Sequence, residues 1–207
     1  RSQDGSLVNT WEIPPTIEKT SLQTRVISFS PDSRFLGLGV SSDKIVLIEL
    51  DSDSKPIVRS GHAGQVTSLL YNMEKNLLLS GGYDGYLCFW NLNQYSLVRV
   101  IKHRPEQAVT TKGNVEGKIV ALSETTDKKF VAVGFMDGAV GIYESTFTSQ
   151  MMKFTAHEKY LFDLSISKLV GLLATSSADF SIRLWHLNAV AVCQKTLRGH
   201  RNIVMTV

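Results

Sequence analysis

Two sets of side chains in this chain have the types and spacing that hydrolytic chemistry would need. The first set is a histidine, a hydroxyl residue, an aspartate and a tryptophan, at His62, Ser80, Asp84 and Trp90. The same types recur 95 positions later, at His157, Thr175, Asp179 and Trp185. An imidazole between a hydroxyl and a carboxylate is the arrangement that activates a serine nucleophile. A hydrolase site is therefore the first hypothesis to weigh.

The surroundings of these residues favour a structural role over catalysis. The set occurs twice at one offset, and a tryptophan completes it each time. The Gly-x-Ser-x-Gly turn that presents a nucleophile in many hydrolases is absent. Ser80 stands instead in the apolar run LLLSGG, which is typical of a central β-strand. We therefore expect both sets to be structural, and we expect no catalytic residue and no enzyme activity.

The offset of 95 residues spans two copies of a shorter repeat. Weaker copies lie before and between the two sets, and the positions equivalent to His62 are Thr20, Val115, His157 and His200. We expect complete repeats over 20–61, 62–114, 115–156 and 157–199, a partial repeat at 1–19 and the start of another at 200–207. An insertion of about 11 residues within 103–117 lengthens the second complete repeat.

Each repeat has the pattern of four short strands. In the repeat 62–114 the segments QVTSLLY, NLLLSGG, YLCFWNL and SLVRVI are apolar or alternating, and turn residues separate them. One twisted four-stranded sheet cannot bury both of its faces alone, but sheets stacked side by side around an axis can. The sequence therefore predicts an all-β chain built as a segment of a β-propeller.

These repeats resemble the WD-repeat β-propeller family. The matching pieces are Gly61-His62 with Asp84 and Trp90, Gly199-His200 at the start of another unit, and the hairpin-like segment FSPDSRFLGLG at 29–39. The resemblance implies that the tryptophan donates to the hydroxyl, the hydroxyl to the histidine, and the histidine to the aspartate. Propellers of this family most often have seven blades, which at ~40–45 residues each exceeds this chain. We therefore expect it to be part of a larger propeller.

Composition and charge exclude several classes of protein. The 207 residues are 43% hydrophobic and 20% charged with a net charge of +3, which excludes disordered and collagen-like chains. No apolar run approaches the ~18 residues of a membrane helix, so we expect no membrane insertion. The two cysteines, Cys88 and Cys193, form no CxxC pair, which fits an intracellular compartment, cytoplasmic or nuclear. No phosphate-loop, dinucleotide or metal motif is present, and we expect no cofactor, metal or small-molecule substrate.

The resemblance also implies where a partner would bind. Partners of this family often dock on the narrow face, at positions that flank the first strand and precede the turn aspartate. Carried over to this sequence, the candidates are Gln65, Tyr83, Lys118, Met136, Tyr160 and Arg201. We expect a non-catalytic scaffold that binds other proteins of a larger assembly. The alternative is a ribonucleoprotein component whose basic clusters, RVIKHR at 99–104 and KTLRGHR at 195–201, contact RNA.

Overall fold

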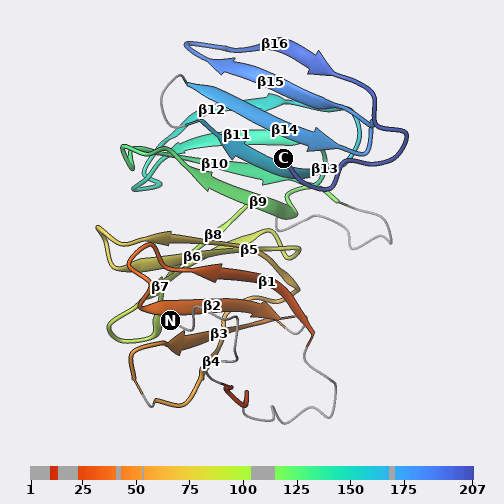
Figure 1. Cartoon of the computed structure of the whole chain (residues 1–207). Helices are drawn as coiled ribbons and strands as arrows, with labels where there is room; N and C mark the ends of the chain where they lie inside the picture. Colours follow the sequence, from red (N-terminus) through yellow and green to blue (C-terminus); the bar gives the residue numbers. More distant parts are fainter. Residues whose placement is uncertain (1–9, 14–22, 41–42, 53, 104–114, 168–170) are drawn as a thin grey trace, which may run out of the picture.

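The structure is built from β-strands, as Figure 1 shows. The computed structural model describes residues 10–13, 23–40, 43–52, 54–103, 115–167 and 171–207. These residues form sixteen strands, and no helix occurs among them. The prediction of an all-β chain is therefore confirmed.

The strands form four antiparallel sheets of four consecutive strands each, here called blades 1 to 4. Blade 1 consists of β1 (Thr24–Phe29), β2 (Phe35–Val40), β3 (Lys44–Glu49) and β4 (Ile57–Ser60). Blade 2 consists of β5 (Val66–Asn72), β6 (Leu77–Gly82), β7 (Tyr86–Asn91) and β8 (Ser96–Lys102). Blade 3 consists of β9 (Ile119–Glu124), β10 (Phe130–Phe135), β11 (Ala139–Glu144) and β12 (Gln150–Thr155). Blade 4 consists of β13 (Leu161–Ile166), β14 (Leu172–Ser177), β15 (Ile182–Leu187) and β16 (Ala191–Leu197).

Short turns with special backbone conformations join the strands. The turns between the second and third strands of blades 2 and 3 place Gly85 and Gly138 at φ angles of 78° and 91°. This left-handed region costs glycine little, which explains the Asp-Gly pairs in the sequence. At Gly138 a Cβ atom would also collide with the carbonyl oxygen of His157, which begins blade 4. The turn of one blade is thus fitted closely to the next.

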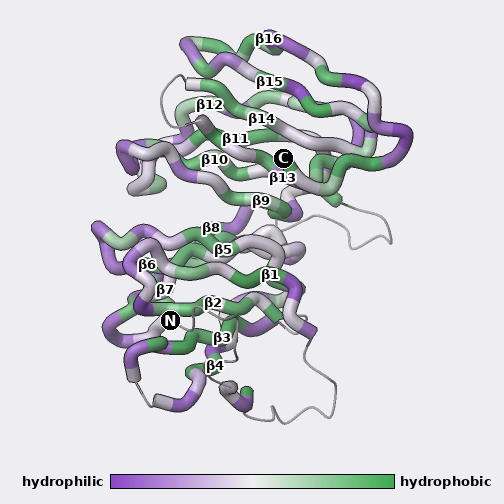
Figure 2. Tube along the Cα trace, in the orientation of Figure 1, coloured by the Kyte–Doolittle hydropathy of each residue, from purple (hydrophilic) through white to green (hydrophobic). Residues whose placement is uncertain are grey.

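Successive blades pack through their apolar faces. The first strands β1, β5, β9 and β13 neighbour one another in that order, so each blade covers a face of the next. Apolar clusters fill the three seams; the first contains Phe35, Leu47, Val66, Leu78 and Trp90. Figure 2 shows the result, with hydrophobic stretches along the strands and hydrophilic residues at their turns. Burial of these apolar side chains is the main favourable contribution to the free energy of folding.

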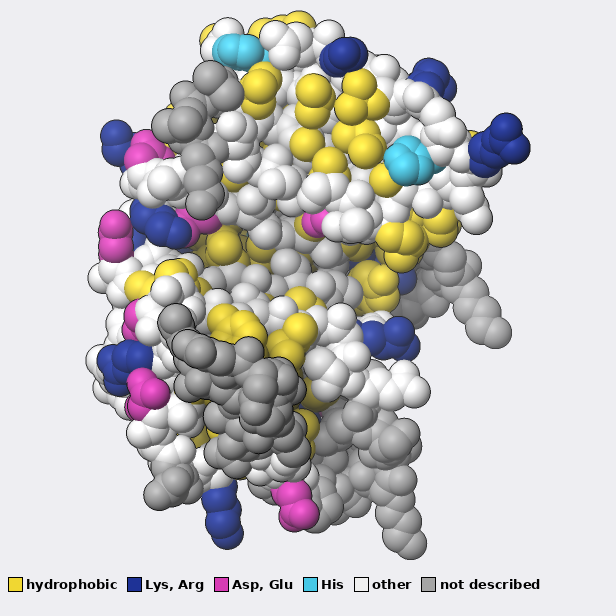
Figure 3. Space-filling model, in the orientation of Figure 1, with side chains coloured by type: hydrophobic (Ala, Val, Ile, Leu, Met, Phe, Trp, Pro, Cys, Tyr) yellow, Lys and Arg dark blue, Asp and Glu magenta, His cyan; other side chains and the backbone are white. Residues whose placement is uncertain are grey.

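The outer faces of blades 1 and 4 differ. In blade 1 the part of that face formed by β2 and β3 is buried, and Trp11 and Ile13 pack against it, whereas Ile27 and Phe29 of β1 are exposed. The rest of the predicted partial repeat 1–19 falls largely outside the described residues, as does the insertion at 104–114. On blade 4, Val204 is buried and its N–H donates to Ser177 O, but Val192 and Leu197 remain exposed. Hydrophobic side chains gather over this sheet in the upper part of Figure 3.

Candidate functional site

In blade 2 the first set of polar residues forms one hydrogen-bonded chain. Trp90 Nε1 donates to Ser80 Oγ at 2.8 Å, and Ser80 Oγ lies 2.7 Å from His62 Nε2. On the other side of the ring, His62 Nδ1 lies 3.0 Å from Asp84 Oδ2. The carboxylate also accepts the backbone N–H groups of Ala63 and Tyr86, at 2.7 and 2.9 Å. These hydrogen bonds join the loop before β5, the strands β6 and β7, and the turn between those two strands.

Blade 4 repeats this arrangement with a threonine in place of the serine. Trp185 Nε1 donates to Thr175 Oγ1 at 2.9 Å, Thr175 Oγ1 lies 2.8 Å from His157 Nε2, and His157 Nδ1 lies 2.8 Å from Asp179 Oδ2. Burial lowers the pKa of His157 below its usual 6.5, although Asp179 opposes this shift. The ring is therefore neutral at pH 7, with its proton on Nδ1 toward the carboxylate and Nε2 accepting from the hydroxyl.

Asp179 of blade 4 is also held by residues of its own turn and strand. The Ser181 hydroxyl and N–H donate to Oδ1 at 2.6 and 3.0 Å, and Arg183 Nη2 lies 3.3 Å from Oδ2. Burial alone would raise the pKa of Asp179, but the hydrogen bonds from Ser181 and His157 outweigh it and lower the pKa to about 2. The carboxylate is therefore ionised at every physiological pH.

Blade 3 retains only part of the arrangement. Val115 and Val133 stand where blade 2 has His62 and Ser80, so neither an imidazole nor a hydroxyl is available. Asp137 Oδ1 still accepts the N–H of Ala139 at 3.1 Å. The tyrosine in the tryptophan position, Tyr143, instead donates its hydroxyl to Gln150 Oε1 at 3.2 Å. Compared with blade 2, blade 3 therefore lacks the hydrogen bonds of the imidazole with the carboxylate and with the hydroxyl, and that of the indole with the hydroxyl.

The geometry gives these sets little capacity for nucleophilic chemistry. Ser80 and Thr175 are both 0% exposed, so a substrate carbonyl has no path to either hydroxyl. Each hydroxyl oxygen accepts from a tryptophan indole and faces a histidine nitrogen. A nucleophile has to be free to approach its substrate, and these oxygens are engaged on both sides.

At the end of the blades where His62 and Asp84 lie, the candidate partner-binding residues meet in pairs around the turns. The Tyr83 N–H donates to Gln65 O at 2.9 Å, and the Met136 N–H donates to Lys118 O at 2.8 Å. Lys118 Nζ also lies 5.7 Å from the centre of the Tyr83 ring, which links blades 2 and 3. In blade 4 the carbonyl of the exposed Tyr160 accepts the N–H of Ala178. We call this group, with Phe180, the candidate binding surface.

Phe180 belongs to this surface although the sequence pattern did not single it out. It follows the turn aspartate Asp179, at the position that Gly85 and Gly138 occupy in blades 2 and 3 and Asp43 occupies in blade 1. Its φ angle is 66°, and its side chain is 42% exposed, with Lys159 Nζ 5.6 Å from the ring centre. The signal that could have found it is the replacement of glycine in an Asp-Gly turn by a bulky residue.

The basic clusters are only partly available to a partner. Arg99 is exposed but already engaged with blade 3, because its Nη1 and Nη2 donate to the carbonyls of Thr146 and Phe147 at 2.9 and 3.0 Å. Lys102 Nζ lies 5.4 Å from the ring centre of Tyr86, and Arg104 falls outside the described residues. In the second cluster Lys195, Arg198 and the candidate residue Arg201 are exposed. The first cluster is thus mainly a contact between blades.

The described part of the chain contains neither a cluster of metal-binding side chains nor a helix that could span a membrane. None of its histidine, cysteine and acidic side chains gather in a group of three or more that could hold a metal ion. Among the same residues, no helix has the length and apolar character to cross a membrane.

Comparison with known proteins agrees with the fold. The family model "WD domain, G-beta repeat" matches residues 55–91 and 148–186, which contain the two complete polar sets. The chain is similar to periodic tryptophan protein 2 of Arabidopsis thaliana, with 28% identity over 183 residues, which cover 87% of this chain and 19% of that protein. It is also similar to the target of rapamycin complex subunit LST8 of Saccharomyces cerevisiae, with 22% identity over 90% of this chain and 74% of that protein.

Several of these matches cover only a small part of the related protein, so they show a shared repeat and not a shared function. The WD repeat-containing protein 3 homolog of Dictyostelium discoideum is 29% identical over 56% of this chain, and the match covers only 12% of that protein. The chain thus spans less than a fifth of the length of two of these relatives. What is shared is the repeat itself, seen in the matched segments, the four-stranded blades and the recurring polar sets. Residues 55–91 and 148–186 are therefore WD40 repeats, and the chain is similar to WD-repeat proteins over most of its length.

Proposed function

We propose that this chain is a non-catalytic protein-interaction scaffold within a larger intracellular multi-protein assembly, and that it binds its partner through the candidate binding surface. Tyr83, Met136, Tyr160 and Phe180 are residue types that carry much of the binding energy in protein interfaces. Lys118 and Lys159 lie beside two of these rings, so positive charge lies next to the aromatic groups although Glu116 and Glu158 are also exposed nearby. A protein segment with apolar and acidic side chains would complement it.

The observation that carries this proposal is the strained and exposed Phe180. A non-glycine residue in the left-handed region costs about 1–2 kcal/mol, and a bulky side chain there is rare. Burial within the chain repays little of this cost, because 42% of the side chain is exposed. Strained residues of this kind cluster at binding sites, where the surroundings hold a side chain in the orientation that a ligand needs.

The names of several relatives support membership of an assembly. The LST8 protein of Saccharomyces cerevisiae and the wat1 protein of Schizosaccharomyces pombe are named as subunits of the target of rapamycin complex. A relative from Drosophila erecta is named as a ribosome biogenesis protein. These names differ too much to identify one complex, but they are consistent with a subunit that binds other proteins.

The proposal is tested by exchanging the strained residue for the glycine that blades 2 and 3 carry at this position. We expect Phe180→Gly to leave the free energy of unfolding unchanged or to raise it by up to about 1 kcal/mol, because glycine relieves the strain. The same change should remove an aromatic contact and reduce recovery of the partner. The measurement is quantitative mass spectrometry of proteins that co-purify with the tagged full chain from cells.

Two further variants complete this experiment. The double change Tyr83→Ala and Tyr160→Ala should also reduce recovery of the partner without unfolding the chain. Phe29→Ala serves as the matched control, since Phe29 is an exposed aromatic residue at the far end of its blade. Unchanged recovery with both surface variants would place the partner elsewhere. Recovery that nuclease treatment abolishes, and that falls steeply with salt, would favour the RNA-binding alternative.

A further inference from the structure

At the end of the molecule opposite the candidate binding surface, an aromatic side chain fills two of the three seams between blades. At this end the turn between the third and fourth strands of one blade meets the preceding blade. In the seam between blades 1 and 2, Tyr95 from this turn packs against Phe35, with ring centres 6.4 Å apart. Its hydroxyl donates to Glu49 Oε2 at 3.2 Å, and Arg59 Nε donates to Tyr95 O at 2.6 Å. An aromatic ring of the following blade thus plugs the seam.

The seam between blades 2 and 3 is plugged in the same way. Phe147 from the turn between β11 and β12 packs edge-on against Phe89, with ring centres 5.2 Å apart. Arg99 on β8 lies over the Phe89 ring and donates to the carbonyls of Thr146 and Phe147. The guanidinium therefore clamps the turn of blade 3 onto blade 2. Ring and clamp together fix this turn in place.

The seam between blades 3 and 4 lacks both features. In the repeat alignment, Met152 takes the place of Arg99, so this strand offers no clamp. The turn of blade 4 consists of Asn188, Ala189 and Val190, which carry no ring, and Val190 is 65% exposed. A cavity of about 240 Å³ opens here. The seam between blades 2 and 3 also has a pocket, of about 260 Å³, but the charged side chains of Lys75 and Arg99 line that one.

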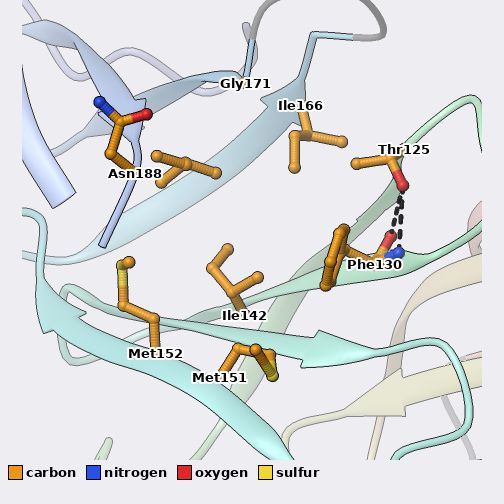
Figure 4. Close-up of a pocket in the computed structure, with 9 residues that line it drawn as sticks. Thr125, Phe130, Ile142, Met151, Met152, Ile166, Gly171 and Asn188 are labelled. Carbon is orange, nitrogen blue, oxygen red and sulfur yellow. Dashed lines mark hydrogen bonds between the residues drawn. The ribbon is translucent and has the colours of Figure 1, made fainter. Parts of the chain in front are cut away.

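The lining of this cavity is almost entirely apolar. Phe130, Ile142 and Ile166 converge on it from three strands, as Figure 4 shows, and Leu187 also belongs to its lining. Met151 and Met152 of β12 complete the lining, and Met151 is 55% exposed. Thioether sulfurs make favourable contacts with aromatic rings and adapt to their shape. An apolar cavity of ~150 Å³ already holds benzene, so this cavity is large enough for a phenylalanine or tyrosine side chain.

We propose that the cavity between blades 3 and 4 is a second binding site, which takes an aromatic side chain from a partner protein. The inserted ring occupies the place that Tyr95 and Phe147 fill in the other seams. The ring comes from another protein because the turn of blade 4 has none to offer. An aromatic residue is favoured over an aliphatic one because both plugged seams use a ring and because two methionines line the cavity.

The site is tested on the full chain with its methionine methyl groups labelled with ¹³C. The chain has five methionines, Met73, Met136, Met151, Met152 and Met205, and only two line the cavity. The probes are N-acetyl-phenylalanine amide and N-acetyl-leucine amide. We expect saturable upfield ring-current shifts of the Met151 and Met152 methyl signals with the phenylalanine probe, weaker binding of the leucine probe, and no shift of the other three signals.

The matched variant is Met152→Arg, which copies the residue of blade 2 at the equivalent position. The arginine should reach the carbonyls of the turn 188–190 as Arg99 reaches those of its own seam, and it should weaken binding of the phenylalanine probe roughly tenfold or more. Met151→Ala removes an exposed side chain and should weaken binding without risk to folding. Phe180→Gly should leave probe binding unchanged, which separates this site from the candidate binding surface.

Several outcomes would overturn the proposal. Absence of a saturable shift, equal shifts of all five methyl signals, or equal affinity for the leucine probe would each reject an aromatic-specific site. Shifts of the Met151 and Met152 signals that follow protein concentration without a probe would assign the cavity to a second copy of this chain. Selection of random displayed peptides should enrich phenylalanine or tyrosine in those that bind the full chain but not Met152→Arg. A selection without such peptides would reject a partner protein as the source of the ring.

Discussion

At the scale of single residues, the same groups that could form a hydrolase site are enclosed in a way that favours stability. Each set spans a loop, two strands and a turn, and its hydroxyl is completely buried. A hydrogen bond within a protein contributes about 0.5–1.5 kcal/mol net, and a buried group left without its partner costs about 1–3 kcal/mol. These residues therefore act on the free energy of unfolding, and blade 3 provides a natural comparison.

We expect Asp84→Ala to destabilise the chain by about 2–3 kcal/mol, because it leaves the His62 imidazole and two backbone N–H groups without an acceptor. Asp137→Ala in blade 3 is the matched control and should cost only about 1 kcal/mol, since no imidazole faces that carboxylate. His62→Ala and Asp179→Ala should likewise lower the melting temperature. Urea denaturation provides the measurement, and equal losses for Asp84→Ala and Asp137→Ala would contradict the structural role of the full set.

A second residue-scale prediction concerns pH. Burial, with a smaller effect of Lys153, lowers the pKa of His103 from 6.5 to about 4. Its ring lies against Phe135 and Tyr143. A histidine whose pKa is lower in the folded state is neutral there while the unfolded chain takes up a proton, so stability is highest above pH 6.5 and falls as the pH drops toward 4.

We expect the melting temperature to be level from pH 8 to 7 and to fall between pH 6.5 and 5. His157, whose pKa is also lowered, contributes in the same direction. His103→Gln should flatten part of this decline, since glutamine does not titrate. The measurement is thermal denaturation by circular dichroism at each pH. If the variant and the original chain lose the same stability over this range, His103 is not the titrating group.

At the scale of strands and turns, the sequence predicts the strands and polar sets that recur in each repeat. It does not predict the side-chain contacts that join one repeat to the next. The strands could be predicted because apolar patterns and turn residues recur in every unit, and the polar sets because His62 and His157 stand at equivalent positions. The role of Arg99 could not be predicted. Its cluster suggested a charged edge or a rim for RNA, but its partners lie about 50 positions away, in the next blade.

The dependence on contacts between blades also explains why sequence patterns did not reveal the aromatic residues in two turns, or Phe180. The aromatic plugs Tyr95 and Phe147 stand in turns where nothing local requires a ring, and their partners belong to the preceding blade. Phe180 was missed because a repeat pattern draws attention to the glycines that recur, at Gly85 and Gly138, rather than to the copies that lack one. Contacts between repeats thus depend on side-chain reach and packing that periodicity does not encode.

The clamp between blades 2 and 3 leads to a prediction at this scale. Arg99→Met copies the residue of blade 3 and should destabilise the chain by about 1–2 kcal/mol, because it removes two hydrogen bonds and a contact with the Phe89 ring. Lys102→Met, on the same edge strand, is the control and should have little effect. Urea denaturation distinguishes the two, and a similar loss for both would mean that the charge of the strand matters rather than the clamp.

At the scale of the whole molecule, stability comes from blades that cover one another, so an uncovered face is a liability. The outer face of blade 1 is buried except at Ile27 and Phe29 of its first strand, whereas Val192 and Leu197 of blade 4 are exposed on the strand at the free edge. Pairing places Val192 opposite His186 and Leu197 opposite Ile182, on the face that does not contact blade 3. Exposed apolar sheet faces and their free edges promote association with other chains.

We expect this chain, studied alone, to self-associate in proportion to its concentration through this face. The double change Val192→Lys and Leu197→Lys should reduce the association, because charged residues on an edge strand oppose pairing. Val98→Lys on the edge strand of blade 2 is the matched control, since Val98 is also exposed but lies away from blade 4. Sedimentation velocity over a wide range of concentrations provides the measurement. A chain that stays monomeric throughout, or a control that suppresses association equally well, would show that the outer face of blade 4 does not drive it.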